Sequence, residues 1–219
     1  MRHLLIDFDG PFCSVFAGLS AGEVAERMRQ QLGAAGHELG PDWAGEGDPL
    51  ALLRRIADEA PGMVADADEV LTGLETEAAR LARPNEEMEA VLDAAAMSGR
   101  AVVVVSNNAG QAIEGYLAKH GLTDRVRGVV GRVPGEPESM KPSPRLLLDA
   151  MGAGADASEY VFIGDAVRDV EAGHAAGVPT IGYANKPRKE RSLADAGAVV
   201  VVTSLVPVAD ALTSPDSDS

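Results

Sequence analysis

Cysteine and positive charge are the scarce components of this 219-residue chain. Its single cysteine, Cys13, excludes an internal disulfide framework and indicates a reducing compartment. Only 19 Lys and Arg stand against 34 Asp and Glu, which gives a formal net charge of -15. Because a field of this sign repels polyanions, nucleic acid and acidic membranes are not expected as partners. A small anionic substrate would need a cation or a local cluster of donors inside its pocket.

Long apolar runs and targeting signals are missing as well. No apolar run approaches the roughly 20 residues that span a bilayer. The first residues, Met1 to His3, run directly into a predicted strand without the layout of a signal peptide. We therefore expect a cytoplasmic protein. With 46% hydrophobic residues and scattered Gly and Pro, the chain can bury one large core, alone or with a smaller module. Oligomeric state is not predicted.

Short apolar, β-branched runs recur along the chain and alternate with helical patterns. Because these runs are almost continuously apolar, they are typical of strands that are buried on both faces of a parallel sheet. We predict an α/β core with a doubly wound, mainly parallel, Rossmann-like sheet. The predicted strands are His3 to Ile6, Ala101 to Val105, Val126 to Val130, Tyr160 to Ile163, Pro179 to Tyr183 and Ala198 to Val202.

Helical segments separate the first two predicted strands. Capping patterns predict a helix from Ser20 to about Leu32, a second over Leu50 to Glu59, and a third that opens at Thr72 and runs through Ala82. The chain is expected to return into the core near Arg83-Pro84, where a helix runs to Met97. We predict a core of residues 1–13 and 83–212, a small α-helical cap over 14–82 inserted after strand one, and a disordered tail over 213–219.

Three of the predicted strands end in polar residues. Ligands of an open parallel sheet bind at the carboxyl ends of its strands, so these residues should meet at one edge. The residues are Asp7 and Asp9 after the first strand, Ser106 and Asn107 after the second, and Asp165 after the fourth, with Asp169 one helical turn further on. A strand repeats every two residues, so Asp7 and Asp9 project to one side and form a hard-cation site.

Lys141 is the candidate for a positive charge at this edge. The prolines of Met140-Lys141-Pro142-Ser143-Pro144 force an extended approach that holds the lysine at the rim. The combined groups are carboxylates for Mg²⁺, a hydroxyl and backbone N–H groups for anionic oxygens, and a point positive charge. This combination favours phosphoryl transfer.

The order and form of these groups resemble the haloacid dehalogenase (HAD) superfamily of hydrolases, in its phosphoglycolate phosphatase-like branch. The first motif of that superfamily corresponds to Asp7-Phe8-Asp9-Gly10, the second to the strand Val102 to Ser106, and the third to Lys141. The fourth, Gly-Asp-x-x-x-Asp, corresponds to Gly164 to Asp169. The resemblance covers nearly the whole core, and the helical insert looks like the mobile cap of that branch.

The resemblance implies a Mg²⁺-dependent phosphatase that hydrolyses a small phosphorylated metabolite through an aspartyl-phosphate intermediate. Asp7 would be the nucleophile, and Asp9 would protonate the leaving oxygen and then activate water. The implied Mg²⁺ ligands are the side chains of Asp7 and Asp165 and the backbone carbonyl of Asp9. Asp169 would bind the metal or orient its ligands.

The resemblance also implies how the phosphoryl group is held. Ser106 and the N–H of Asn107 would bind its oxygens, and Lys141 would neutralise charge there and beside Asp7. Two other activities share part of this pattern. A phosphosugar mutase of the β-phosphoglucomutase type returns the phosphoryl group to a sugar. A phospho-receiver signalling domain has a similar set of groups, but its acceptor lies on a later strand and no helical insert follows strand one.

The chain departs from the resemblance after Gly10, where many relatives continue Thr-Leu or Val-Leu. Here the sequence is Pro11-Phe12-Cys13-Ser14, and because Pro11 has a fixed φ and no N–H, we expect a stiffer exit into the cap. Cys13 is expected to pack, since no base is evident beside its thiol.

Recognition of the leaving group would fall to the cap, where no motif identifies the residues. The candidates there are Arg27, Arg54, Arg55 and Trp43. Arg168 is expected to be a local charge partner of the neighbouring acids.

Overall fold

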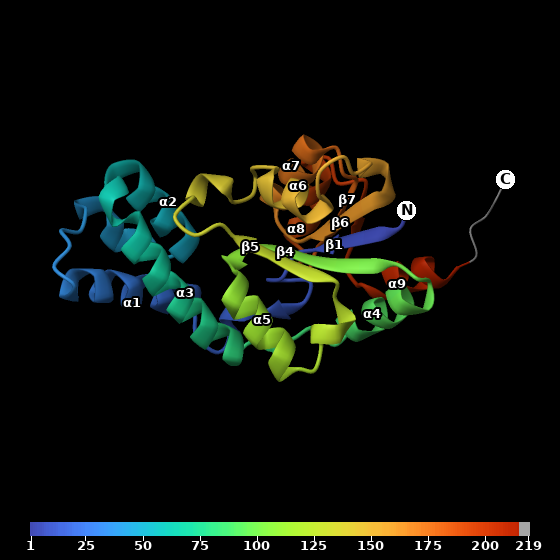
Figure 1. The fold of residues 1–219 in the computed structure, drawn as a ribbon, viewed down its shortest axis with the longest axis horizontal. Helices are drawn as coiled ribbons and strands as arrows, with labels where there is room; N and C mark the ends of the chain where they lie inside the picture. The colour runs from blue at the N-terminus through green and yellow to red at the C-terminus, as the bar shows by residue number, and fades with distance from the viewer. Residues whose placement is uncertain (215–219) are drawn as a thin grey trace.

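The computed structural model describes residues 1–214 and contains the predicted doubly wound α/β core (Figure 1). Its main sheet has the strand order β5-β4-β1-β6-β7-β8, and every pairing is parallel. The strands are β1 (His3–Ile6), β4 (Ala101–Ala109), β5 (Gly128–Arg132), β6 (Tyr160–Gly164), β7 (Thr180–Tyr183) and β8 (Val200–Val202). All six predicted strands are therefore confirmed, β1 with the predicted bounds and the other five with shifted ends.

The described helices either cover the two faces of this sheet or lie beyond it. They are α1 (Ala21–Ala34), α2 (Pro49–Glu59), α3 (Val64–Arg80), α4 (Met88–Met97), α5 (Gly110–Lys119), α6 (Arg145–Met151), α7 (Val167–Ala176), α8 (Lys189–Asp195) and α9 (Val206–Thr213). Figure 1 shows α4, α5 and α9 below the sheet and α6, α7 and α8 above it.

Alternation along β1 explains these two layers. Leu4 and Ile6 belong to one buried cluster together with Ile113 of α5, whereas Leu5 packs in a second cluster with Leu147 of α6. Successive side chains of a strand point to opposite faces, so an entirely apolar strand needs helices on both sides. The central position of β1, between β4 and β6, follows from this double burial.

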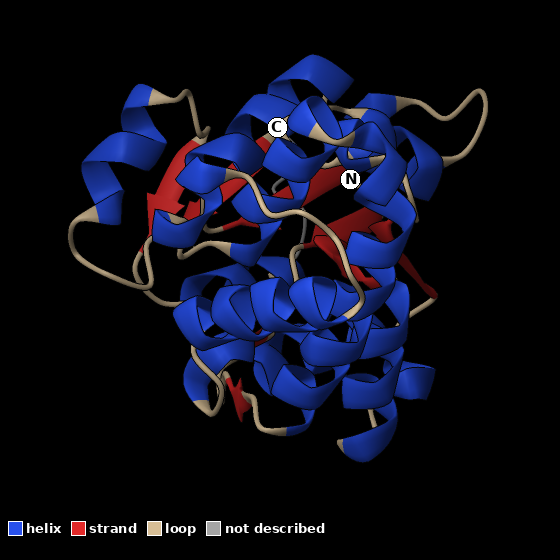
Figure 2. Ribbon diagram, turned by 90° about the vertical axis from the view of Figure 1, so that its left-hand side faces the viewer, coloured by secondary structure: helices blue, strands red, loops and turns tan. Residues whose placement is uncertain are grey.

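Helices α1 and α2 lie beyond the sheet, at the left of Figure 1, and α3 runs from them to α5. Met28, Leu52 and Leu71, one from each helix, are fully buried in their shared interior. Figure 2 views the molecule from this end, with the blue helices stacked in front of the red strands. The predicted starts of α1 and α2 are confirmed by caps from Ser20 and Asp48.

The two chain segments that join α1–α3 to the sheet pair with each other. Strand β2 (Cys13–Ser14) runs antiparallel to β3 (Arg83–Pro84), with Cys13 opposite Pro84. The side chain of Asn85 donates to the carbonyl of Pro11 at 2.9 Å. Entry and exit therefore form one short ribbon that is tied to the turn after β1.

Three predicted boundaries were wrong. Helix α3 begins at Val64 rather than Thr72, because the turn Pro61–Met63 leads directly into it and leaves Thr72 in mid-helix. Helix α4 begins at Met88 instead of near Arg83-Pro84, since those residues pair as β3. Helix α9 continues through Thr213, so the predicted disordered tail does not begin there, and its remainder, 215–219, lies outside the described residues.

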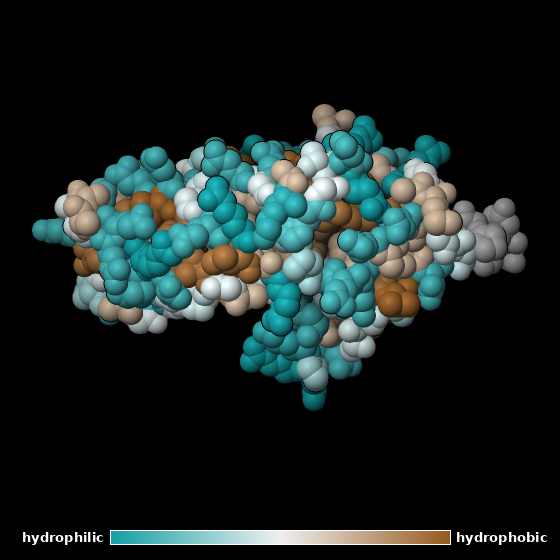
Figure 3. All heavy atoms as spheres, turned by 90° about the horizontal axis from the view of Figure 1, so that it is seen from below, coloured by the Kyte–Doolittle hydropathy of each residue, from teal (hydrophilic) through white to brown (hydrophobic). Residues whose placement is uncertain are grey.

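The face seen from below in Figure 3 is mainly hydrophilic, with separate brown patches of apolar side chains. Among the described helices, none combines the length and the apolarity that crossing a membrane requires.

Candidate active site

Asp7 lies at the carboxyl edge of the sheet, directly after the central strand β1. Its N–H donates to the carbonyl of Ile163 at 2.9 Å, which continues the pairing of β1 with β6. Its side chain is buried, and one oxygen, Oδ1, accepts from the N–H of Phe8 at 2.8 Å. The sheet thus fixes both the depth and the orientation of this carboxylate.

Gly10 allows the turn after β1 to pack against a second acid. Its φ is +112°, in the region that favours glycine, and a Cβ there would lie 2.4 Å from Oδ2 of Asp165. Gly164 has a similar role, because its Cβ would lie 2.4 Å from Cβ of Asp169. Two glycines of the motifs therefore make room for the carboxylates that follow β6.

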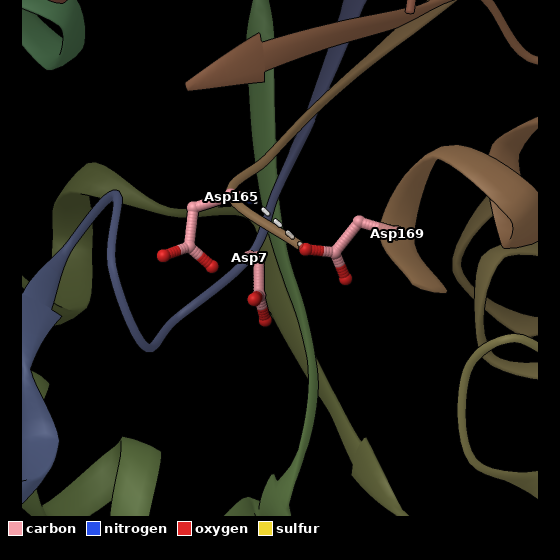
Figure 4. A group of neighbouring side chains, drawn as sticks. All are labelled: Asp7, Asp165 and Asp169. Atoms are coloured by element: carbon pink, nitrogen blue, oxygen red, sulfur yellow. Dashed lines mark hydrogen bonds between the residues drawn. The ribbon is translucent and has the colours of Figure 1, made fainter. Parts of the chain in front are cut away.

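Asp7, Asp165 and Asp169 converge at this edge (Figure 4). One carboxylate oxygen from each lies within 4.8 Å of the others, and all three side chains are buried. Oδ2 of Asp169 accepts from the N–H groups of Asp165 and Ala166, at 3.0 and 2.9 Å. Asp169 therefore braces the start of α7 with one oxygen and turns the other towards the cluster.

Lys141 provides the positive charge at the centre of the cluster. Its Nζ lies 2.8 Å from Oδ1 of Asp7 and 2.7 Å from Oδ1 of Asp169, and the residue is only 1% exposed. The ammonium also lies 5.2 Å from the ring centroid of Phe162. The lysine predicted to lie at the rim is in fact buried between two of the predicted acids.

Burial and the repulsion of neighbouring acids disfavour ionisation of Asp7 and Asp165. Burial raises the pKa of Asp7 to about 8, although Lys141 opposes the shift and Asp169 adds to it. Burial also raises the pKa of Asp165, against the opposing charge of Lys189. Burial would lower the pKa of Lys141, but its two carboxylate partners outweigh this, and the pKa is raised. The cluster therefore has a deficit of positive charge.

The residues fit a divalent metal ion on these grounds. Three buried carboxylates with an oxygen each in a small space are the ligands that Mg²⁺ prefers, and a cation would oppose the burial and repulsion that raise the pKa values of Asp7 and Asp165. Of the Asp165 oxygens, Oδ2 accepts from Asn185 at 2.8 Å and from Lys189. Within residues 1–214, no donor is found on Oδ1, which leaves that atom for a metal.

Asp9 lies beside the cluster but in a different environment. Its Oδ1 accepts from the N–H of Val15 at 3.0 Å, so the side chain helps to hold the exit from the turn. Burial raises the pKa of Asp9 to about 6, while the hydrogen bond from Val15 opposes the shift. A carboxyl group with this pKa exchanges a proton readily near neutral pH.

Ser106 and Asn107 lie where β4 departs from regular pairing, between Val105 and Ala109. The hydroxyl of Ser106 accepts from the N–H of Asn108 at 3.2 Å. The Asn107 side chain is paired with the backbone of Lys141, accepting from its N–H at 2.7 Å and donating to its carbonyl at 3.2 Å. The segments of two predicted motifs are therefore joined directly.

A cavity of about 300 Å³ opens onto these groups. Its lining includes Asp7, Ser106 and Lys141, together with Asp48 and Leu50 at the start of α2. The remaining lining residues are Asp9, Phe16, Ala21, Asn107, Asn108, Asp165, Ala166, Arg168 and Asp169. The cavity thus combines every predicted site residue with side chains from the helical insert.

Of the four predicted leaving-group candidates, Arg54 comes nearest to this cavity. The half-buried guanidinium donates to the carbonyl of Lys141 at 2.9 Å. Burial lowers the pKa of Arg54, and the nearby charge of Arg168 adds to this effect. The other three make contacts within the insert: Arg27 with Glu77, Arg55 with the carbonyl of Asp42, and Trp43 with Glu59.

Arg168 does not pair with the neighbouring acids as predicted. Among the described residues it has no salt bridge, and its side chain lines the cavity instead. Asn185 and Lys189, which contact Asp165, were not predicted. Both residues follow β7. Asn185 comes shortly after the carboxyl end of this strand, so the rule applied to the other strand ends also identifies it as a candidate.

Cys13 is buried and is not equipped as a nucleophile. Burial raises the pKa of its thiol, and the charges of Asp9 and Asp7 add to the effect, so the thiolate is disfavoured. Its Sγ lies 3.9 Å from the carbonyl of Phe8. These contacts agree with the packing role expected of this residue.

Known proteins share this combination of fold and site. Residues 49–183 match the haloacid dehalogenase-like hydrolase family. A phosphoglycolate phosphatase of Rhodospirillum rubrum is 28% identical over 98% of this chain and 92% of its own. An N-acetylmuramic acid 6-phosphate phosphatase of Pseudomonas aeruginosa is 28% identical over 82% of this chain and 80% of its own.

Solved structures agree on the fold. A predicted phosphatase from Clostridium acetobutylicum superposes with a TM-score of 0.70 at 17% identity, covering 96% of this chain and 97% of that one. The expected resemblance is confirmed by the family match, which extends over more than half of the chain. The protein is an enzyme of the haloacid dehalogenase-like hydrolase family, with phosphatases among its relatives.

Proposed function

We propose that the protein is a Mg²⁺-dependent phosphatase that hydrolyses a small phosphorylated metabolite through an aspartyl-phosphate intermediate. The observation that carries this proposal is the buried cluster of Asp7, Asp165 and Asp169 around the Nζ of Lys141. The family match supports the reaction class, and the cavity of about 300 Å³ supports a small substrate.

In the first step, Asp7 attacks phosphorus through Oδ2, since Oδ1 already accepts from Lys141 and Phe8. The bond from phosphorus to the leaving oxygen breaks as the new bond forms. Asp9 gives its proton to that oxygen, so the leaving group departs as a neutral alcohol. The pKa of Asp9, raised to about 6, keeps part of this group protonated at neutral pH.

In the second step, the same groups act in reverse. Asp9, now ionised, takes a proton from a water molecule as its oxygen attacks phosphorus. The bond between phosphorus and Asp7 breaks, which releases inorganic phosphate and restores the carboxylate. Asp9 regains its proton, and the cycle is balanced without any further reactant.

Bound Mg²⁺ would supply electrostatic stabilisation to the phosphoryl oxygens and the Asp7 carboxylate. The proposed ligands are the side chains of Asp7 and Asp165 and the backbone carbonyl of Asp9, with Asp169 as a further ligand or as an orienting group. An orienting role for Asp169 is supported by its Oδ2, which accepts hydrogen bonds from two backbone N–H groups. The hydroxyl of Ser106, the N–H of Asn107 and the ammonium of Lys141 are proposed to hold the phosphoryl oxygens.

We also propose that residues 14–82 act as a cap on a core of 1–13 and 83–212. The paired entry and exit strands β2 and β3 support a boundary at this point. Asp48 and Leu50, which line the same cavity as Asp7, would exclude water when substrate is bound. Pro11, which is buried and tied to Asn85, supports a stiff connection.

For the substrate, we propose a phosphate ester whose leaving group carries a second anionic group. Arg168 lines the cavity, and Arg54 donates to the carbonyl of Lys141, which also lines it. Burial lowers the pKa of Arg54, and the charge of Arg168 adds to this effect. A carboxylate between two such cations would relieve their repulsion. 2-Phosphoglycolate, which the name of the Rhodospirillum rubrum relative indicates as its substrate, has such a group.

The test is phosphate release from a panel of phosphorylated metabolites with Mg²⁺, using the parent and Asp7→Asn. We expect turnover by the parent and a loss on the order of 10⁴-fold or more in the variant, with folding retained. Activity of the variant equal to that of the parent would exclude Asp7 as the nucleophile. Conversion of a hexose 1-phosphate into its 6-phosphate would instead identify a mutase, and a long-lived phosphoprotein without turnover would identify a receiver.

A further inference from the structure

Arg132, the last residue of β5, is buried at a point where three parts of the chain meet. Its side chain is 1% exposed, yet all of its nitrogen atoms have oxygen partners. Nε donates to Asp68 at 2.6 Å, Nη1 to Glu75 at 3.0 Å, and Nη2 to the hydroxyl of Thr72 at 3.3 Å. A guanidinium with this many directed contacts is held in one orientation.

The three partners lie on one face of α3. Asp68, Thr72 and Glu75 are spaced at i, i+4 and i+7, which places them in line along a helix. Asp68 and Glu75 are buried, although charged residues are rarely buried without partners. Helix α3 therefore presents a polar stripe to the edge of the sheet, at Arg132.

The same arginine contacts the segment proposed to bind phosphate. Its Nη1 also donates to the carbonyl of Asn107 at 3.0 Å. Glu75 then accepts from the next two residues, at 2.9 Å from the side chain of Asn108 and at 2.9 Å from the N–H of Ala109. Arg132 and Glu75 together hold every residue from 107 to 109.

The backbone of this segment is irregular and close to β5. The pairing shifts between Val105–Val130 and Ala109–Arg132, so four steps along β4 match two along β5. A Cβ on Gly131 would lie 2.8 Å from the carbonyl of Asn108. Backbone groups of this bulged segment therefore lack the hydrogen bonds of a regular parallel ladder. Arg132 and Glu75 provide hydrogen-bond partners for them instead.

We propose that Arg132 and Glu75 are a positioning pair that holds segment 106–109 in the shape needed for phosphate binding and ties it to helix α3. The inference rests on the proposed function of Ser106 and Asn107. Neither residue of the pair lines the cavity, so both act through the segment. Since α3 also packs against α1 and α2, a shift of the cap would be transmitted to the phosphate site through these contacts.

The experiment measures affinity for inorganic phosphate, by calorimetry with Mg²⁺ present, and kcat and KM for one phosphate ester. We compare the parent with Arg132→Lys, which keeps the charge but cannot reach all four partners, and Glu75→Gln, which keeps the shape. We expect phosphate affinity and kcat/KM to fall on the order of 10- to 100-fold in Arg132→Lys, with a smaller loss in Glu75→Gln.

A stability control separates positioning from folding. Leu212→Ala removes a buried side chain on α9, which packs against α4 away from the cavity. It should lower the melting temperature while leaving phosphate affinity unchanged below the transition.

A second variant, Arg132→Met with Glu75→Met, removes one charge of each sign, so we expect it to be more stable than Arg132→Met alone. Its phosphate affinity should stay low, because the carbonyl of Asn107 and the N–H of Ala109 lose their partners.

Each outcome decides the proposal. Normal phosphate affinity in folded Arg132→Lys, or recovery of both stability and affinity in the double variant, would show that the pair is only structural. If Arg132→Met does not fold, the proposal is decided by the phosphate affinity of Arg132→Lys compared with that of Leu212→Ala. A parent that neither binds phosphate nor hydrolyses the ester would contradict the proposed function instead.

Discussion

At the residue scale, Asp9 is the group whose chemistry can be separated most cleanly from its structural role. Asp9→Asn keeps an oxygen that can accept from the N–H of Val15, as Oδ1 does at 3.0 Å, but it cannot donate a carboxyl proton. An alkyl phosphate needs protonation of its leaving oxygen, whereas p-nitrophenolate departs without it. We expect kcat/KM to fall roughly 10²- to 10⁴-fold for the alkyl ester and less for p-nitrophenyl phosphate.

The matched comparison for this prediction is Asp7→Asn. Loss of the nucleophile should reduce turnover of both esters by the same factor, since attack on phosphorus precedes either departure. Steady-state kinetics with the two esters measure the ratio. Equal losses for both esters in Asp9→Asn would contradict a general-acid role.

Arg168 allows a residue-scale test of the proposed leaving group. Arg168→Met removes a guanidinium from the cavity wall while retaining much of its length. We expect KM for 2-phosphoglycolate to rise about tenfold, with little change for an ester whose leaving group is neutral, because a charged hydrogen bond is lost only in the first case. Steady-state kinetics on both esters measure the difference.

Arg127→Met is the control for this prediction, since it removes the same charge from an exposed residue that precedes β5, on the opposite edge of the sheet. A similar rise in KM for both variants would assign the effect to net charge. A rise for both esters in Arg168→Met would argue against selection of a second anionic group.

At the scale of elements, Asn85 connects the entry and exit of the helical insert with the start of α4. Its Oδ1 accepts from the N–H of Glu87 at 3.1 Å, and its Nδ2 donates to the carbonyl of Pro11 at 2.9 Å. Asn85→Ala should lower the free energy of unfolding by about 1 to 2 kcal/mol, since it removes the acceptor of the Glu87 N–H and leaves a part-buried carbonyl without its donor. Urea unfolding measures this change.

Ser192→Ala is the control variant, since it also removes a side-chain hydrogen bond to the backbone. Ser192 is exposed, and its hydroxyl donates to the carbonyl of Lys189 within the short helix α8. We expect a change within about 0.5 kcal/mol there. If Asn85→Ala were equally mild, the ribbon of β2 and β3 would have to be held by its backbone pairing alone.

The elements also show what the sequence could predict. Continuous apolar runs identified the strands because burial on both faces leaves no room for alternation. The convergence of Asp7, Ser106 and Asp165 followed, since parallel strands bring their carboxyl ends to one edge. The start of α3 was misplaced because Thr72-Gly73-Leu74-Glu75 has the form of a capping box, although both polar side chains serve tertiary contacts in mid-helix.

The contacts that remained hidden depend on where α3 crosses the sheet. Arg132 and Glu75 are 57 residues apart, and neither position has a local pattern that marks it as buried. Their pairing requires α3 to lie against the end of β5, which no periodicity in the chain specifies. Local rules thus predicted which residues meet at the carboxyl edge of the sheet, but not the polar contacts between a helix and that edge.

At the scale of the whole molecule, the net charge of -15 bears on the effect of metal. The excess of acid includes three buried carboxylates, with Lys141 and Lys189 as their cationic partners. Since a ligand that binds only the folded state stabilises it, Mg²⁺ should raise the melting temperature in a saturable way. At a free concentration 100 times its Kd, the gain is about 2.7 kcal/mol.

Asp165→Asn provides the site-specific comparison, because it removes one carboxylate of the cluster and keeps an oxygen for the side chain of Asn185. Its melting temperature without Mg²⁺ should equal or exceed that of the parent, since it removes a carboxylate whose ionisation is disfavoured by burial and by repulsion from Asp169. Its response to Mg²⁺ should shift to higher concentration. NaCl at equal ionic strength separates screening of the surface charge from binding, because screening acts equally on both proteins. An identical Mg²⁺ response in the two proteins would place the ion outside the carboxylate cluster.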